Sequence, residues 1–294
     1  MTSSSPVEVK DAASGKTHRD ENFPVASILI APQFRAPILA FYNFVRAADD
    51  ISDHADLAPE QKLALLDRLD MALLQEGPDE EPARVLREEL QARNLTPRHA
   101  RDLLVAFRRD VTKLRYDDWD DLIDYCRYSA MPVGRFVLDV HGEDAAKTWP
   151  ANDALCAALQ IVNHLQDCGK DYRDLNRVYL PQDTLKAFGA KVEMLGEPKA
   201  PTPLRAALRG LAQRTGLLLR EARPFAELID DTRLAMEVGA IHGLAAALTR
   251  RLCVADPLSE KVHAGKAEFA AYSLLGAMGA LLRRPFRGKS GARA

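Results

Sequence analysis

The sequence predicts an all-α fold. Segments in which apolar residues recur every three or four positions alternate with short breaks that carry Pro or Gly, which is the pattern of amphipathic helices. We find no convincing run of alternating β-branched residues of the kind that indicates a strand. The chain has 294 residues and is 47% hydrophobic, which is enough to bury the core of one large domain. We therefore expect a single helical bundle.

The expected helices follow one another from about residue 37. Pro37 suits the first turn of a helix, and the apolar spacing that follows it continues to Ser52. Further helices are expected over 59–75, 80–93, 97–111, 119–140, 151–170, 203–229, 231–252 and 266–282. Pro132 should kink the 119–140 helix. The breaks are short except for 171–201, which is a candidate active-site lid.

The composition of the chain and of its two termini limits which classes of binding partner are expected. Residues 1–20 are expected to be disordered, and 283–294 form a basic tail. The net charge is −2, so no basic field argues for a nucleic-acid partner. Four cysteines without metal or disulfide spacing indicate a reduced, cytoplasmic protein. The longest apolar run, 273–282, is about half of the roughly 20 residues that a membrane span requires, so any membrane contact should be peripheral.

Two acidic clusters carry the strongest functional signal. Asp49 and Asp53 are four positions apart, as are Asp167 and Asp171, and each pair lies on a stretch patterned as helix. This spacing places both carboxylates of a pair on one helical face, where unpaired like charges repel. Acidic groups near a helix C-terminus also oppose the helix dipole. We therefore expect a cation between the clusters, and Mg²⁺ fits best because it takes oxygen ligands from carboxylates and substrate phosphates.

Other polar side chains share these faces. Asn163 precedes the second cluster, and its amide oxygen completes a plausible oxygen-ligand set for Mg²⁺. Arg46 and Asp50 could instead form a solvated intrahelical ion pair, which is the ordinary alternative for the first cluster. Three bases follow the second cluster and can balance the charge of a metal-bound diphosphate. They are Lys170, Arg173 and Arg177.

These residues together resemble the squalene/phytoene synthase family of isoprenoid enzymes, over about residues 18–252. The first family motif, Tyr, Arg and Asp-x-x-x-Asp, matches Tyr42, Arg46, Asp49 and Asp53. The second, Gln-x-x-Asn-x-x-x-Asp-x-x-x-Asp followed by Arg-x-Tyr-Leu-Pro, matches Gln160, Asn163, Asp167, Asp171, Arg177, Tyr179 and Pro181. The resemblance implies one isoprenoid synthase domain, 21–282, that encloses a central substrate cavity. It further implies that Mg²⁺ and basic residues assist the departure of pyrophosphate, so that a carbocation forms away from water.

The resemblance also assigns roles to single residues. Tyr125 lies in a stretch similar to the family's Tyr-Cys…Ala…Val-Gly helix and is expected to line the pocket, with an ordinary core tyrosine as the alternative. The expected catalytic residues are Asp49, Asp53, Asp167, Asp171, Tyr125 and His242. The expected substrate-binding residues are Tyr42, Arg46, Asp50, Gln160, Lys170, Arg173, Arg177 and Tyr179. The expected metal ligands are Asp49, Asp53, Asn163, Asp167 and Asp171.

Three departures from the common family pattern indicate a subfamily. The chain has His18 to Pro24 where a His-Ser-x-Ser-Phe-like start is usual, Gln166 where an Arg is usual, and His242 where a tyrosine is usual. These features resemble the hydroxysqualene synthases of the bacterial hopanoid pathway, which convert presqualene diphosphate and water to hydroxysqualene. Such an enzyme binds one diphosphate rather than two and depends on a presqualene diphosphate synthase for its substrate. His242 could orient or deprotonate the water, although a lone helical His is more often structural.

Three other functions stay open at this level. A complete head-to-head synthase would condense two prenyl diphosphates to squalene or phytoene. A head-to-tail elongating enzyme fits the Asp-Asp-x-x-Asp of residues 49–53, but Asp167-Cys168-Gly169-Lys170-Asp171 lacks the second adjacent aspartate. A non-enzymatic assembly factor on the same fold would have little use for five acidic residues that face a cavity.

Overall fold

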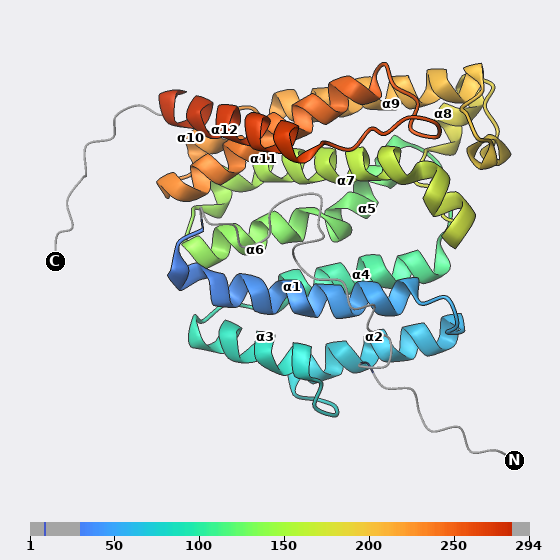
Figure 1. The fold of residues 1–294 in the computed structure, drawn as a ribbon. Coiled ribbons are helices and arrows are strands. Elements are labelled where there is room, and N and C mark those ends of the chain that lie inside the picture. Colours follow the sequence, from blue (N-terminus) through green and yellow to red (C-terminus); the bar gives the residue numbers. More distant parts are fainter. Residues whose placement is uncertain (1–8, 10–29, 284–294) are drawn as a thin grey trace, which may run out of the picture.

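A computed structural model of the chain describes residue 9 and residues 30–283 (Figure 1). Residues 1–20, for which disorder is expected, lie outside the described part apart from residue 9. The unusual stretch from His18 to Pro24 and the basic residues after 283 also lie outside it. Within it, the all-α prediction is confirmed, because the described residues form helices and no strand, with one isolated bridge between Arg115 and Val178.

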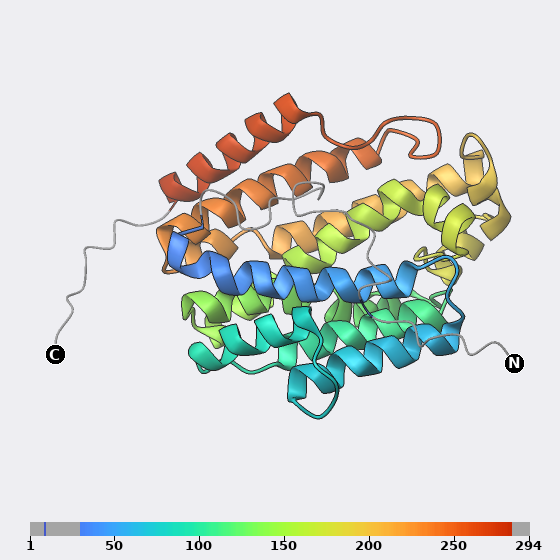
Figure 2. The same cartoon turned by 60° about the horizontal axis from the view of Figure 1, so that its bottom comes forward.

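The helices pack in layers around the longest one. The elements in chain order are α1 (Pro32–Asp53), α2 (Pro59–Leu74), α3 (Glu81–Ala92), α4 (Arg98–Thr112), α5 (Trp119–Ser129), α6 (Met131–His141), α7 (Ala145–Leu175), α8 (Gln182–Ala187), η2 (Val192–Gly196), α9 (Thr202–Glu221), α10 (Phe225–Leu228), α11 (Thr232–Leu252) and α12 (Lys266–Arg283). Helix α7 contacts α5, α6, α9 and α11, while α1 contacts α2, α3, α4 and α6. In both views α12 lies on the outside of the bundle against α11 (Figures 1 and 2).

Two of the expected helices are each split in two. The 119–140 helix was predicted to kink at Pro132, but α5 ends at Ser129 and α6 begins at Met131, with Ala130 at φ −132° and ψ −46°. Pro132 lies in the first turn of α6, where its missing N–H costs no hydrogen bond. The 203–229 helix also ends early, at Glu221, and Pro224 is the N-cap of the short α10.

Helix α7 is longer than predicted at both ends. Its N-terminus is capped by Asp144, whose carboxylate accepts from the Ala146 amide, and it runs through Pro150. It continues to Leu175, so the whole second acidic cluster is helical. The long break expected after residue 170 is correspondingly shorter. It contains α8 and η2, and Val178 and Leu180 at its start are buried.

Small residues allow close helix contacts at two places. A Cβ on Gly276 of α12 would lie 2.1 Å from the Gly239 carbonyl oxygen of α11. A Cβ on Gly134 of α6 would lie 1.9 Å from Asn152 Oδ1 and 2.8 Å from Cys156 Sγ, both on α7. These distances are far below van der Waals contact. A side chain at Gly276 would force the backbones of α11 and α12 apart, whereas one at Gly134 would displace the side chains of Asn152 and Cys156.

Candidate active site

The C-terminal end of α1 presents the first acidic cluster. Arg46 pairs with Asp49 at 3.0 Å and with Asp50 at 2.7 Å, so the expected intrahelical ion pairs are present. Asp50 is buried, whereas the side chain of Asp49 is 36% exposed. Desolvation, followed by the charge of Asp53, raises the pKa of Asp49 to about 7. Two carboxylates that repel each other in this way create a site that a cation would stabilise.

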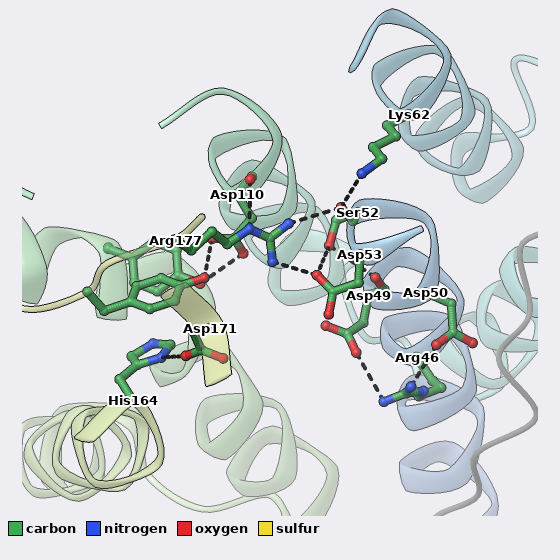
Figure 3. A network of polar contacts seen from close by, with 12 residues as sticks. Arg46, Asp49, Asp50, Ser52, Asp53, Lys62, Asp110, His164, Asp171 and Arg177 are labelled. Atoms are coloured by element: carbon green, nitrogen blue, oxygen red, sulfur yellow. Dashed lines mark hydrogen bonds and ion pairs between the residues drawn. The ribbon is translucent and has the colours of Figure 1, made fainter. Parts of the chain in front are cut away.

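Arg177 connects this cluster to the neighbouring helix α4. Its guanidinium is buried and donates to the Asp53 carboxylate at 2.5 Å, to the Ser52 carbonyl at 2.9 Å and to the Asp110 carbonyl at 3.0 Å (Figure 3). Lys62 Nζ donates to the same Ser52 carbonyl at 3.1 Å. With all three nitrogens engaged, Arg177 holds the end of α1 in place. Sequence reasoning assigned it to substrate binding and missed Lys62.

Asp110 is a second residue that sequence reasoning missed. It is buried and its carboxylate accepts from Tyr125 Oη at 2.9 Å and from Tyr179 Oη at 2.8 Å. Burial raises the pKa of Asp110, and the charge of Arg177 and the two phenols oppose that rise. A signal for Asp110 was present, because it continues the helical spacing of Leu103 and Phe107 on the buried face of α4.

The second acidic cluster lies on α7. Asp171 Oδ2 is 3.9 Å from His164 Nδ1, and Asp167 Oδ1 is 3.5 Å from His263 Nε2. Desolvation raises the pKa of Asp167, and His263 opposes this. Figure 3 shows Asp49 and Asp53 of α1 on the side of the site opposite Asp171, with Arg177 along its edge. The structure therefore brings Asp171 of the second cluster into one region with Asp49 and Asp53 of the first.

The bases that follow the second cluster are not equivalent. Lys170 is 66% exposed and pairs with Asp174 at 3.1 Å. Arg173 is exposed, and its Nη1 would lie 3.0 Å from a Cβ on Gly169. Both side chains are therefore on the surface of α7 and can move towards a ligand, in contrast to the buried Arg177.

The side chain of Asn163 shows whether the residues of this region fit a Mg²⁺ ion. Its side-chain oxygen is buried and has no hydrogen-bond partner among the described residues, which is costly for an acceptor unless a donor or cation meets it. Within residues 30–283, no three His, Cys, Asp or Glu side chains are arranged to hold a metal ion by themselves. Mg²⁺ does not require such a cage, since it is usually bound through one or two carboxylates and substrate phosphates. The donor set therefore fits Mg²⁺ that arrives with a diphosphate.

An apolar cavity of about 310 Å³ adjoins this region. It is lined mainly by side chains of α1, α6, α7 and α11, including Ile38, Phe41, Val137, Leu155 and Val238. Its lining residues on α1 end at Val45, one turn before Asp49, and those on α7 end at Gln160, one turn before Asn163. Both helices thus run from the cavity to the acidic clusters. Tyr42 and Gln160 line the cavity, as expected of substrate-binding residues.

Two expected catalytic residues lie outside the described cavity lining. Tyr125 is buried and is not among the lining residues, and its hydroxyl donates to the Asp110 carboxylate. His242 Nε2 is 2.8 Å from the Leu219 carbonyl of α9, while its neighbour Ile241 lines the cavity. Desolvation lowers the pKa of His242, which favours the neutral ring. A role for His242 in water capture gains no support from these contacts and stays a prediction.

Gln166 also has a structural partner. Its side chain is buried, and Nε2 donates to the Val262 carbonyl at 3.3 Å in the segment that precedes α12. This contact holds Gln166 within the protein, and its interpretation as a mark of the subfamily stays a prediction.

Comparison with known proteins agrees with this geometry. The pattern of the squalene/phytoene synthase family matches residues 16–268. The chain is 57% identical to a hydroxysqualene synthase of Rhodopseudomonas palustris, over 97% of this chain and 96% of the relative, and 51% identical to one of Zymomonas mobilis, over 91% of each. The crystal structure of the squalene synthase HpnC from Alicyclobacillus acidocaldarius matches with a TM-score of 0.68 and 33% identity, covering 78% of this chain and 86% of that one. A dehydrosqualene synthase structure, at 23% identity and a TM-score of 0.74 over 90% of this chain and 92% of that one, shares the fold. The chain belongs to the squalene/phytoene synthase family.

Proposed function

We propose that the protein is a hydroxysqualene synthase, which converts presqualene diphosphate and water to hydroxysqualene and pyrophosphate. The observation that carries the proposal is an apolar cavity between helices that continue into two acidic clusters, in a chain that is 51–57% identical to three proteins of that name. Phytoene synthases match at 28–30% identity over shorter parts of the chain, so a complete head-to-head synthase is the less favoured function.

The residues of the site suggest how the reaction proceeds. Asp49, Asp53, Asn163, Asp167 and Asp171 would hold Mg²⁺. When bound, Mg²⁺ neutralises charge on the diphosphate and so favours its departure. Arg177 keeps Asp53 in position, and the exposed Arg173 and Lys170 can approach the phosphate oxygens.

The cavity then protects the cation. Its apolar lining keeps bulk water from the hydrocarbon chain, and the aromatic faces of Phe41 and Tyr42 offer π-electron density to positive charge. Whether one water molecule reaches the cation decides whether the product is an alcohol or a hydrocarbon.

Product analysis tests the proposal directly. The protein is incubated with Mg²⁺ and presqualene diphosphate in H₂¹⁸O, and the products are identified by mass spectrometry. We expect an alcohol that carries ¹⁸O, because capture of a carbocation by water places solvent oxygen on carbon. Efficient turnover of farnesyl diphosphate alone, or a purely hydrocarbon product, would favour the head-to-head synthase. No turnover, together with no thermal stabilisation by Mg²⁺ and pyrophosphate, would favour a non-enzymatic assembly factor.

We further propose that the protein works in the cytoplasm at the inner face of the membrane, where a presqualene diphosphate synthase supplies its substrate. In residues 30–283 no helix is long and apolar enough to cross a bilayer. Helix α12, however, exposes five large apolar side chains before the basic tail. They are Leu274, Leu275, Met278, Leu281 and Leu282. Each tail base would add about 1 kcal/mol at an anionic surface.

Vesicle sedimentation tests this attachment. We expect salt-sensitive binding to anionic vesicles and weaker binding to neutral ones. The protein is compared with a chain truncated after Leu282 and with a variant in which Leu274 and Leu275 are both changed to Ser. Equal sedimentation of all three proteins would refute the attachment.

A further inference from the structure

His164 occupies the junction between the cavity and the acidic clusters. It lies on α7 one turn after Gln160, which lines the cavity, and two turns before Asp171. Its side chain is only 11% exposed. The imidazole stacks on the ring of Tyr179, with centroids 3.5 Å apart and planes 14° apart, and Tyr179 is itself fixed by its hydrogen bond to Asp110. The ring of His164 is therefore held in one orientation (Figure 3).

The contacts of His164 indicate which nitrogen of its ring accepts a hydrogen bond. Gln160 Nε2 lies 3.1 Å from His164 Nε2. An amide nitrogen can only donate, so Nε2 of the imidazole is the acceptor and the ring N–H is at Nδ1, on the side of Asp171. The site thus presents a fixed acceptor next to a residue of the cavity lining. In the structure this acceptor is engaged by the Gln160 amide.

Water capture needs such acceptors. The attacking oxygen must direct a lone pair at the carbocation, so both hydrogens of the water must be directed elsewhere. Around an apolar cavity a water is retained only where it finds several polar partners. The Gln160 side chain, which lines the cavity, offers its Oε1, and the His164 ring, in contact with Gln160 one turn further towards the acidic clusters, offers Nε2.

We propose that Gln160 and His164 hold the water that captures the carbocation, in place of the direct hydrogen bond that they make to each other. This inference rests on the proposed hydroxysqualene synthase activity. The carbon–oxygen bond to the diphosphate breaks and its electron pair leaves with pyrophosphate. The water oxygen forms the new carbon–oxygen bond, and its extra proton passes to an oxygen of the released pyrophosphate. His164 positions the water through Nε2.

The ratio of alcohol to hydrocarbon among the products tests the proposal. His164→Phe keeps a flat ring against Tyr179 but removes both nitrogens. We expect the share of alcohol to fall about tenfold, which is the effect of one lost hydrogen bond at the upper end of the usual range, while consumption of presqualene diphosphate falls less. His164→Gln, which retains an acceptor, should recover part of the alcohol. A purely structural role would lower the rate and leave the ratio unchanged.

His141→Phe is the matched control, since it is the same substitution on a histidine whose Nδ1 contacts a backbone carbonyl, that of Val137, outside the site. We expect its product ratio to equal that of the unaltered protein. An unchanged ratio in His164→Phe, or an equal fall in His141→Phe, would overturn the inference. If His164→Phe does not fold, Gln160→Leu removes the other partner and should cause the same fall. Absence of alcohol from the unaltered protein would instead overturn the proposed function.

Discussion

Arg177 should be a major contributor to stability as well as to the site. It makes three hydrogen bonds to groups on α1 and α4, two of them to carbonyl oxygens, and its side chain is 8% exposed. Breaking a buried charged pair by removing one partner typically costs 3–5 kcal/mol. The Asp53 side chain is 40% exposed, so its carboxylate regains water after the substitution and the cost belongs at the lower end. We expect Arg177→Met to lower the free energy of unfolding by about 3 kcal/mol.

Urea titration followed by circular dichroism measures this change, and a thermal melt should show a Tm lower by roughly 6 °C or more. Arg84→Met is the matched control, because Arg84 also pairs with two carboxylates, Asp79 and Glu88, but on the surface of α3. It should change stability little, since exposed ion pairs contribute little. Equal losses in the two variants would show that the buried contacts of Arg177 have no special weight and would refute the reasoning.

Three further outcomes are expected. Asp53→Ala and Asp167→Ala should each abolish Mg²⁺-dependent turnover with an unchanged circular dichroism spectrum, and near-normal rates in both would remove the metal assignment. Because the pKa of Asp49 is raised to about 7 in the folded state, mainly by desolvation, the folded protein holds this proton more tightly, so metal-free stability should fall as pH rises from about 4 to 7. Asp49→Asn should remove that part of the slope in urea titrations at several pH values, and an identical slope would contradict the assignment. Gly134→Ala should destabilise by about 1–3 kcal/mol through overpacking against α7, whereas Gly216→Ala, where a Cβ meets nothing within 4 Å, should be neutral or stabilising in the same melts.

The sequence predicted the features of the fold that depend on interactions between residues close together in the chain. The helical periodicity and the spacing of Asp49 with Asp53 and of Asp167 with Asp171 are properties of neighbouring residues, and the structure places members of both pairs in one region. The break between α5 and α6 was not predicted. A proline can kink a helix or begin a new one, and the apolar periodicity around Pro132 does not distinguish these outcomes. The family resemblance added the cavity, which spacing alone does not show.

Contacts between residues far apart in the chain could not be predicted from the sequence. Arg177 was assigned to substrate binding because it follows the second cluster, yet its partners are Ser52, Asp53 and Asp110, from 67 to 125 positions away. Tyr125 was expected in the pocket, but it faces Asp110, whose helix packs against α5. Only the packing of helices determines which face of a tyrosine-bearing helix meets the ligand and which meets a buried carboxylate.

The continuity of α7 has a consequence for the length of substrate that the protein accepts. Asn152 and Cys156 line the cavity on the same unbroken helix that carries Asp167. At 1.5 Å per residue, they lie about 22 Å and about 16 Å from Asp167 along the axis. A rigid helix thus fixes the separation between the phosphate end and the floor of the cavity. A larger side chain at Cys156 would raise that floor by about 6 Å relative to Asn152, and so change the size of prenyl chain that can be held.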